Sequence, residues 1–216
     1  MKLWQRLKGM RVTEQLAELF QTKGRDEQGA MLEALEHYVG EFRRVEREQR
    51  PSTGARAFAT HEAMTVWIAQ AVARPPGGAV VQCRRGCASC CRLLITVFPD
   101  EAALALDAAR EAGLELDRDR LHRQAAARTV GAWRALSRED RTCVFLQGDE
   151  CGIYEHRPSA CRKYAVASPR ELCDTDQHPG TEVAMVVSGM AEIITSAAVT
   201  VWGEAPFAAA VLKALA

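Results

Sequence analysis

The cysteines are the residues of this sequence whose type and spacing could do chemistry. The chain has eight, and all lie between residues 83 and 173: Cys83, Cys87, Cys90, Cys91, Cys143, Cys151, Cys161 and Cys173. Four of them fall within the nine residues CRRGCASCC at 83–91. Two or three residues between thiols let one loop present several sulfurs to the same metal, and Gly86 permits the backbone turn that such a loop needs. This spacing predicts a thiolate metal centre.

Two other uses of cysteine fit the sequence less well. A disulfide framework is typical of secreted chains, but the first twenty residues have no apolar run of signal-peptide length and no small-residue cleavage site. We therefore expect a cytoplasmic protein in a reducing environment. Inert buried thiols are also disfavoured, because these cysteines are clustered with Gly, Arg and Ser rather than with core residues. Closely spaced cysteines in such a protein are interpreted first as metal ligands.

The number of thiols leaves the form of the centre open. Thiolates select zinc or iron–sulfur clusters among the common metals. Eight thiols could serve two four-thiolate sites, or one site with several thiols left free. The side chains of adjacent Cys90 and Cys91 usually point apart, so one of them could bind a different metal, accept a hydrogen bond or stay free. The long gap between Cys91 and Cys143 means that one site could join two halves of the domain.

The later cysteine motifs carry a family resemblance. The segments TCVFL at 142–146 and CGIYEHRPSACRKY at 151–164 resemble the paired motifs of the YkgJ-type cysteine-cluster family, also known as a zinc- or iron-chelating CxxCxxCC domain. Residues 83–91 resemble the first motif of that family, so the resemblance spans about residues 83–173. Flagellin lysine N-methylase is similar over the same cysteine motif. That similarity implies an iron–sulfur cluster in preference to zinc.

The resemblance also implies roles for individual residues. It makes seven cysteines candidate metal ligands: Cys83, Cys87, Cys90, Cys91, Cys143, Cys151 and Cys161. Cys173 lies outside the tightest motif and is a further candidate. The residues given a structural or outer-sphere role around the ligands are Tyr154, Arg157, Pro158 and Arg162.

Arginines near the cysteines have two interpretations. These residues are Arg84, Arg85, Arg92, Arg157 and Arg162. They could offset the negative charge of a thiolate cluster, or they could bind an anionic substrate beside it. We favour charge compensation. Because the formal net charge of the chain is zero, we expect neither a specific nucleic-acid partner nor a membrane partner.

Three hypotheses about function follow. The first is a metal-binding protein with a cysteine-ligated centre, preferably an iron–sulfur cluster, whose role is structural or electron-carrying and serves a protein partner. The second is a zinc-binding module with a structural or interaction role, or a zinc or iron storage or sensing protein. The third is a cluster-dependent protein-modifying enzyme like the lysine N-methylase, which predicts S-adenosylmethionine binding. The chain has no glycine-rich strand-to-helix loop for that cofactor, and no catalytic residue is assigned.

The remaining residues predict a mainly α-helical fold, with little or no β structure, in which helices surround an irregular, loop-built metal centre. Apolar periodicity predicts helices over residues 12–22, 26–49, 55–73, 100–113, 117–137, 181–201 and 204–215. The short run of residues 93–98 is either a strand or a buried connector. The break at residues 51–54 divides an N-terminal helical arm (1–50) from the cysteine-cluster domain (51–216).

Particular positions in these helices have expected roles. The seam of the 26–49 helix is formed by Met31, Leu35, Tyr38, Phe42 and Val45, and it packs on the rest of the chain or, alternatively, on a second copy in a homo-oligomer.

We expect Asp100 to cap its helix and His61 to be a partly buried helix residue. The apolar stripe of the 117–137 helix is Leu121, Ala125, Ala126, Val130, Trp133 and Leu136. Glu192, in the centre of the apolar segment 181–201, favours a buried helix over a membrane span.

Overall fold

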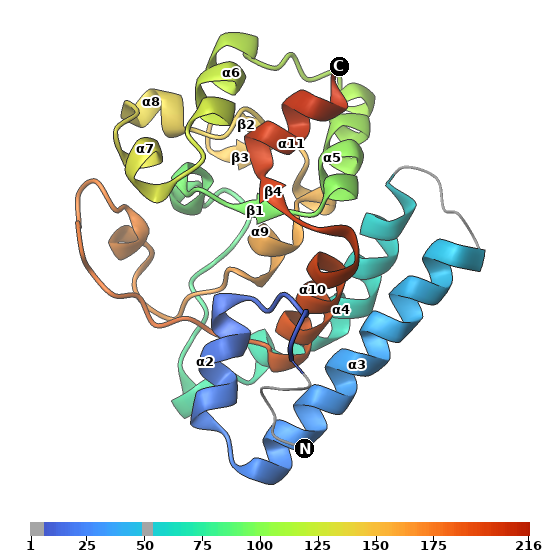
Figure 1. Cartoon of the computed structure of the whole chain (residues 1–216). Coiled ribbons are helices and arrows are strands. Elements are labelled where there is room, and N and C mark those ends of the chain that lie inside the picture. The colour runs from blue at the N-terminus through green and yellow to red at the C-terminus, as the bar shows by residue number, and fades with distance from the viewer. Residues whose placement is uncertain (1–6, 49–53) are drawn as a thin grey trace.

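The computed structural model describes residues 7–48 and 54–216, and its regular structure is mainly helical (Figure 1). The α-helices are α2 (Glu14–Thr22), α3 (Arg25–Glu48), α4 (Ala55–Ala73), α5 (Pro99–Glu111), α6 (Arg118–Ala126), α7 (Val130–Arg134), α8 (Arg138–Arg141), α9 (Ser159–Lys163), α10 (Gly189–Trp202) and α11 (Phe207–Ala214). Single 3-10 turns are η1 (Pro76–Gly78), η2 (Ser89–Arg92), η3 (Tyr154–His156) and η4 (Arg170–Cys173). The predicted mainly α-helical fold is confirmed.

The β structure of the described residues consists of two small antiparallel pairs. Strand β1 (Thr96–Val97) pairs with β4 (Ala205–Pro206), and β2 (Leu146–Gln147) pairs with β3 (Glu150–Cys151). The run 93–98 therefore contains a short strand, β1, preceded by an irregular segment. Its pairing with β4 places the start of α5 beside the start of α11.

One hydrophobic core is built by α2, α3, α4 and α10. Leu32, Leu35, Val39 and Phe42 of α3 are buried in it together with apolar residues of α10. The predicted seam was partly wrong, because Met31 and Tyr38 lie only half-buried at the edge of this cluster while Leu32 and Val39 take the central positions. The predicted boundary at residues 51–54 falls mostly outside the described residues, and homo-oligomer formation through this helix stays a prediction.

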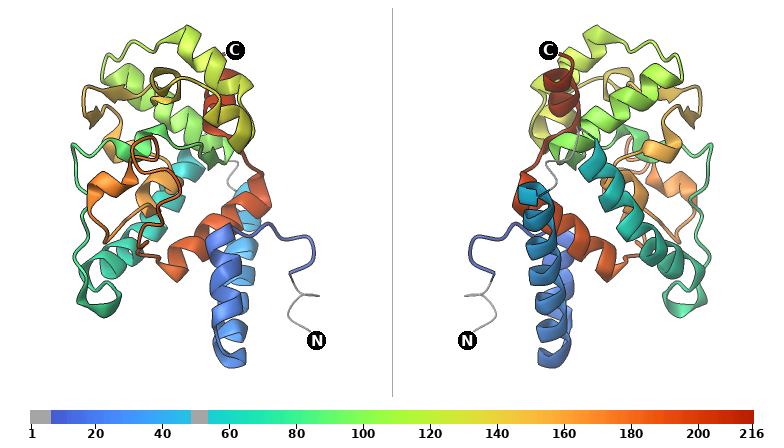
Figure 2. Two further views of the ribbon diagram at one scale, coloured as in Figure 1. Left: turned by 90° about the vertical axis from the view of Figure 1, so that its left-hand side faces the viewer. Right: turned by 90° about the vertical axis from the view of Figure 1, so that its right-hand side faces the viewer.

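A second core is built by α5, α6 and α11. It buries Leu121, Phe145, Ile153 and Val211, and the rings of Phe145 and Phe207 stack with centroids 5.4 Å apart. Figures 1 and 2 show the two cores at opposite ends of the molecule, with α9 between them. The chain passes from one core to the other where α10 leads through β4 into α11. Cys143 and Cys151 pack against the second core.

The predicted helix over 117–137 is two helices. Ala127 and Thr129 leave the helical conformation, and the Thr129 hydroxyl accepts a hydrogen bond from the Ala132 N–H to start α7 in a new direction. Val130 is 57% exposed and Ala126 is also exposed, so neither belongs to the apolar stripe. Leu121, Ala125 and Trp133 are buried as expected.

The start of α5 also differs from the prediction. Phe98 is the N-cap residue and Pro99 is the first helical residue, a position that tolerates proline because the missing N–H has no partner there. Asp100 is therefore not the cap. It is buried and receives two hydrogen bonds from the Arg56 guanidinium of α4, at 2.6 and 2.5 Å. Gly113 ends the helix with φ +64°, as the sequence predicted.

The apolar segment near the C-terminus forms α10, which begins at Gly189 rather than near residue 181. Glu192 is buried in it and accepts hydrogen bonds from the Lys163 ammonium (2.6 Å) and the Thr13 hydroxyl (2.7 Å). Within the described residues, no helix has the combination of length and hydropathy needed to cross a membrane.

Candidate metal centre

Seven of the eight cysteines line a single cavity of about 310 Å³. They are Cys83, Cys87, Cys90, Cys91, Cys143, Cys151 and Cys161. Three separate segments of the chain contribute them, and each segment is held in place by backbone hydrogen bonds. The structure thus brings together residues that are up to 78 positions apart in the sequence.

The first segment is the loop of residues 83–91. Gly86 has φ +82°, a left-handed conformation that residues with a side chain rarely adopt, and the Cys87 N–H donates to the Arg84 carbonyl across this turn (3.1 Å). The turn lets the loop reverse between Cys83 and Cys87. Cys90 and Cys91 then lie in η2. The expected role of Gly86 is confirmed.

The other end of this loop is tied to a later part of the chain. The Gln82 N–H donates to the Val166 carbonyl (2.8 Å), and the Val166 N–H donates to the Cys83 sulfur (3.3 Å). An N–H aimed at a sulfur stabilises the thiolate form over the thiol. Val166 therefore holds Cys83 at two points, the backbone of the preceding residue and the sulfur itself.

The second segment carries Cys143 and Cys151 on the β2–β3 hairpin. The Cys143 N–H donates to the Cys91 carbonyl (2.8 Å), which joins early and late cysteines that are 52 positions apart in the sequence. In the hairpin, Cys151 pairs with Leu146, whose N–H donates to the Cys143 carbonyl (3.0 Å). The two hairpin cysteines are therefore close neighbours, as the short sequence between them allows.

The third segment carries Cys161 on α9. This short helix begins at Ser159, whose N–H donates to the carboxylate of Glu101 on α5 (2.5 Å). Glu101 is 2% exposed and also contacts Nε2 of buried His61 on α4 (2.8 Å). Sequence reasoning missed Glu101, because an acidic residue in the first turn of a helix is ordinary. His61 is buried more fully than expected, at 3% exposure.

Burial and crowding govern the ionisation of these thiols. Burial, with a smaller contribution from the nearby Cys151 and Cys90, raises the pKa of Cys143 to about 12. Burial also raises the pKa of Cys161 well above its ordinary value. The hydrogen bond with Cys91, followed by burial, does the same to the pKa of Cys90. The Cys90, Cys143 and Cys161 thiols without metal are therefore protonated at neutral pH, and several adjacent thiolates need a cation to offset their charge.

Cys173 occupies a different position from the other seven. It lies at the end of η4, is 7% exposed and does not line the cavity. Burial, with smaller contributions from Cys83, Cys87 and Cys90, raises its pKa to about 11. Cys173 therefore lies next to the 83–91 loop but outside the cavity that this loop helps to form.

Most of the residues predicted to surround the metal ligands line the cavity. Arg84, Arg157, Pro158 and Arg162 line the cavity together with Tyr154 and Tyr164. The guanidinium carbon of Arg157 lies 3.8 Å from the centroid of the Tyr154 ring, and Arg162 donates to the carbonyls of Arg157 (2.9 Å) and Glu155. Burial raises the pKa of Tyr164 to about 12.

In the part of the chain that the structure describes, Arg85 and Arg92 do not line the cavity. Arg85 is exposed and forms an ion pair with Glu150 (3.7 Å), whereas Arg92 donates to the Ala88 carbonyl (3.4 Å). Arg157, which lines the cavity, has a direct effect on the thiols. Its positive charge lowers the pKa values of Cys83, Cys90 and Cys151, although burial raises each of these values by more. Arg85 also lowers the pKa of Cys151, and charge compensation by the arginines stays a prediction.

The donor set fits a thiolate-bound metal by its chemistry and location. Sulfur donors on a shared, largely apolar wall are the ligands that zinc and iron–sulfur clusters take. Across residues 7–48 and 54–216, no three or more His, Cys, Asp or Glu side chains already enclose a point that could hold a metal ion. The side chains must therefore turn to complete a coordination shell. The assignment of each cysteine as a ligand stays a prediction.

Comparison with known families agrees with this chemistry. Residues 82–181 match the family CxxCxxCC, whose description is "Putative zinc- or iron-chelating domain". The match covers all eight cysteines and confirms the resemblance seen in their motifs, and it supports metal binding by the chain. No curated protein and no solved structure matches the chain. Helices α2, α3, α4, α10 and α11 lie outside the matched residues, and two of them, α4 and α11, contact helices within the match.

Proposed function

We propose that the CxxCxxCC domain holds an iron–sulfur cluster in the cavity that its cysteines line. The observation that carries this proposal is the convergence of seven thiols on one cavity of about 310 Å³. A structural zinc ion closes on four ligands at roughly 2.1 to 2.3 Å, so one zinc would use few of these thiols and little of this space. A cluster is larger and is also held by cysteine thiolates. The similarity to flagellin lysine N-methylase in the same motif favours iron as well.

The other residues of the cavity would support such a group. Ile68, Phe145 and Phe207 form part of an apolar wall that limits the access of water. Arg157 and Arg162 place positive charge beside the sulfurs, and no carboxylate is paired with either guanidinium among the ion pairs of the described residues. A bound cluster would supply one-electron transfer or a rigid cross-link between the three cysteine segments. We propose that this serves a protein partner in the cytoplasm, where free cysteines are maintained.

The test is the metal and sulfide content of protein purified without oxygen. Iron with a matching amount of acid-labile sulfide and broad visible absorbance is the expected result. Cys161→Ser should lower the iron per chain, whereas Ser89→Ala, in the first cysteine loop, should not. Zinc without sulfide would refute the cluster and leave a zinc-binding module. A protein that takes up neither metal would refute metal binding itself.

A further inference from the structure

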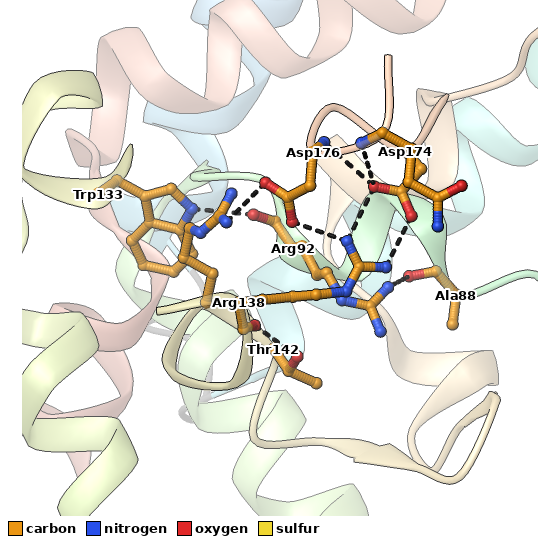
Figure 3. A network of polar contacts seen from close by, with 9 residues as sticks. Ala88, Arg92, Trp133, Arg138, Thr142, Asp174 and Asp176 are labelled. Atoms are coloured by element: carbon orange, nitrogen blue, oxygen red, sulfur yellow. Dashed lines mark hydrogen bonds and ion pairs between the residues drawn. The ribbon is translucent and has the colours of Figure 1, made fainter. Parts of the chain in front are cut away.

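Four charged side chains form a network next to the cysteine-lined cavity. Arg138, Asp174 and Asp176 are labelled in Figure 3, and the fourth residue, Arg141, also lines that cavity. Arg138 donates to both carboxylate oxygens of Asp174, at 2.9 and 2.6 Å, and to Asp176 at 2.7 Å. Arg141 donates to the other oxygen of Asp176 at 2.6 Å. We call Arg138, Arg141, Asp174 and Asp176 the clasp. Two parallel hydrogen bonds between Arg and a carboxylate fix orientation as well as adding energy.

The clasp connects parts of the chain that carry cysteines. Arg138 and Arg141 belong to α8, and the Arg138 carbonyl accepts a hydrogen bond from the Thr142 hydroxyl (3.0 Å), next to Cys143. Asp174 directly follows Cys173. The clasp therefore joins the position of Cys173 to the element that leads into Cys143.

A second contact extends this connection to the first cysteine loop. The Trp133 indole N–H donates to the Arg92 carbonyl (2.9 Å), immediately after Cys91 (Figure 3). Since the Cys143 N–H also donates to the Cys91 carbonyl, the helical segment of α7 and α8 is fixed to the first loop at two points. The clasp is thus anchored on a rigid part of the centre.

The segment on the other side of the clasp has few anchors of its own. We call residues 170–178 the strap. Its backbone hydrogen bonds are local, such as Asp174 N–H to Glu171 and His178 N–H to Asp174. Within the described residues, the hydrogen bonds and ion pairs that join the strap to another helix all end on Arg138 or Arg141. Most of the strap is exposed or half-buried, whereas Cys173 is buried.

We propose that Arg138 is a positioning residue that fastens the strap, so that Cys173 stays against the 83–91 loop and slows the release of metal from the centre. This inference rests on the proposed metal binding. Cys173 lies outside the cavity, and its 3-10 turn η4 contacts η2, which carries Cys90 and Cys91, so a fastened strap keeps the Cys173 thiol against the first loop. When the clasp opens, Cys173 leaves with the strap and the loop becomes accessible to a competing ligand.

The experiment measures how fast metal-loaded protein, with iron or with zinc according to what it carries, loses metal to an excess of chelator without oxygen. Arg138→Ala should accelerate release about tenfold, which corresponds to about 1.4 kcal/mol. Arg138→Lys keeps the charge but loses the forked geometry, so its release rate should lie between the rates of the wild type and Arg138→Ala. Release from the wild type should also rise between about 0.1 and 1 M salt, because the Debye length falls from about 10 to about 3 Å.

Two controls separate this role from a general effect on folding. Arg123→Ala removes a similar ion pair, with Asp140 of α8 at 2.8 Å, that does not reach the strap, and it should leave the release rate unchanged. In a Cys173→Ser background, Arg138→Ala should have no additional effect, because the clasp acts through that thiol.

Each outcome decides the inference. Equal release rates for Arg138→Ala and wild type would overturn it, and so would an equal acceleration by Arg138→Ala in the Cys173→Ser background. In both cases metal binding itself would stand. If the wild-type protein takes up neither iron nor zinc, the proposed function fails, and this inference fails with it.

Discussion

Replacing Glu101 with alanine should destabilise the protein strongly, because this one buried carboxylate joins three elements. It is 2% exposed and contacts the Ser159 N–H (2.5 Å), the Phe98 N–H (3.3 Å) and the His61 ring (2.8 Å). Each buried donor left without an acceptor costs about 1 to 3 kcal/mol. With two backbone donors and one imidazole affected, we expect a loss of about 4 kcal/mol from the free energy of unfolding. That is a large part of the roughly 5 to 15 kcal/mol typical of a domain.

The assay is urea unfolding of the metal-free, reduced protein, followed by circular dichroism. Glu101→Gln keeps an oxygen that can accept from one N–H, so it should cost about 1 to 2 kcal/mol. Glu111→Ala, at the exposed end of the same helix, is the matched control and should change stability by less than about 0.5 kcal/mol. If the free energy of unfolding of Glu101→Ala lies within about 1 kcal/mol of the wild-type value, the carboxylate does not hold α9 in place.

Three further predictions concern packing, a buried ion pair and the metal. A Cβ on Gly152 would lie 2.6 Å from a methyl of Leu114 and 3.2 Å from a backbone oxygen, so Gly152→Ala should cost about 1 to 3 kcal/mol in thermal or urea unfolding. Gly131→Ala, which meets nothing within 4 Å, should instead stabilise by about 0.4 to 1 kcal/mol; a loss comparable to that of Gly152→Ala would contradict the steric explanation. Glu192→Ala leaves the Lys163 ammonium, 12% exposed, without its carboxylate, and should cost about 3 to 5 kcal/mol by the same assay. Glu192→Gln keeps an acceptor oxygen and should cost less; a loss below about 1 kcal/mol for Glu192→Ala would contradict the importance of this ion pair. Removing bound metal with a chelator under reducing conditions should lower the thermal midpoint in calorimetry, because metal that binds only the folded state stabilises it; an unchanged midpoint would indicate that the centre does not stabilise the fold.

The local features of this protein could be predicted from its sequence. Periodicity identified the principal helices, and α4 spans the predicted residues 55–73. The spacing of residues 83–91 indicated a loop that turns at Gly86, and its φ of +82° agrees. These predictions succeed because helix periodicity, glycine turns and thiol spacing are properties of a few neighbouring residues.

Helix boundaries were less predictable, because competing local interactions decide them. The residues 117–137 have a continuous helical pattern, but the Thr129 hydroxyl caps a new helix and the chain changes direction there. Asp100 reads as a cap in the sequence, yet Arg56 of another helix is available to pair with it in the fold. Neither outcome follows from propensity alone.

The sequence by itself determined the helical content, the sulfur donor set and the turn of the first cysteine loop. Only the tertiary structure decided which thiols share a cavity. The hydrogen bond from the Cys143 N–H to the Cys91 carbonyl joins residues 52 positions apart, Glu101 supports α9 from another helix, and Cys173 remains outside the cavity behind the clasp. Contacts of this kind depend on how two hydrophobic cores position the loops between them. No pattern of neighbouring residues encodes that arrangement, because its energy comes from groups that meet only after the chain has folded.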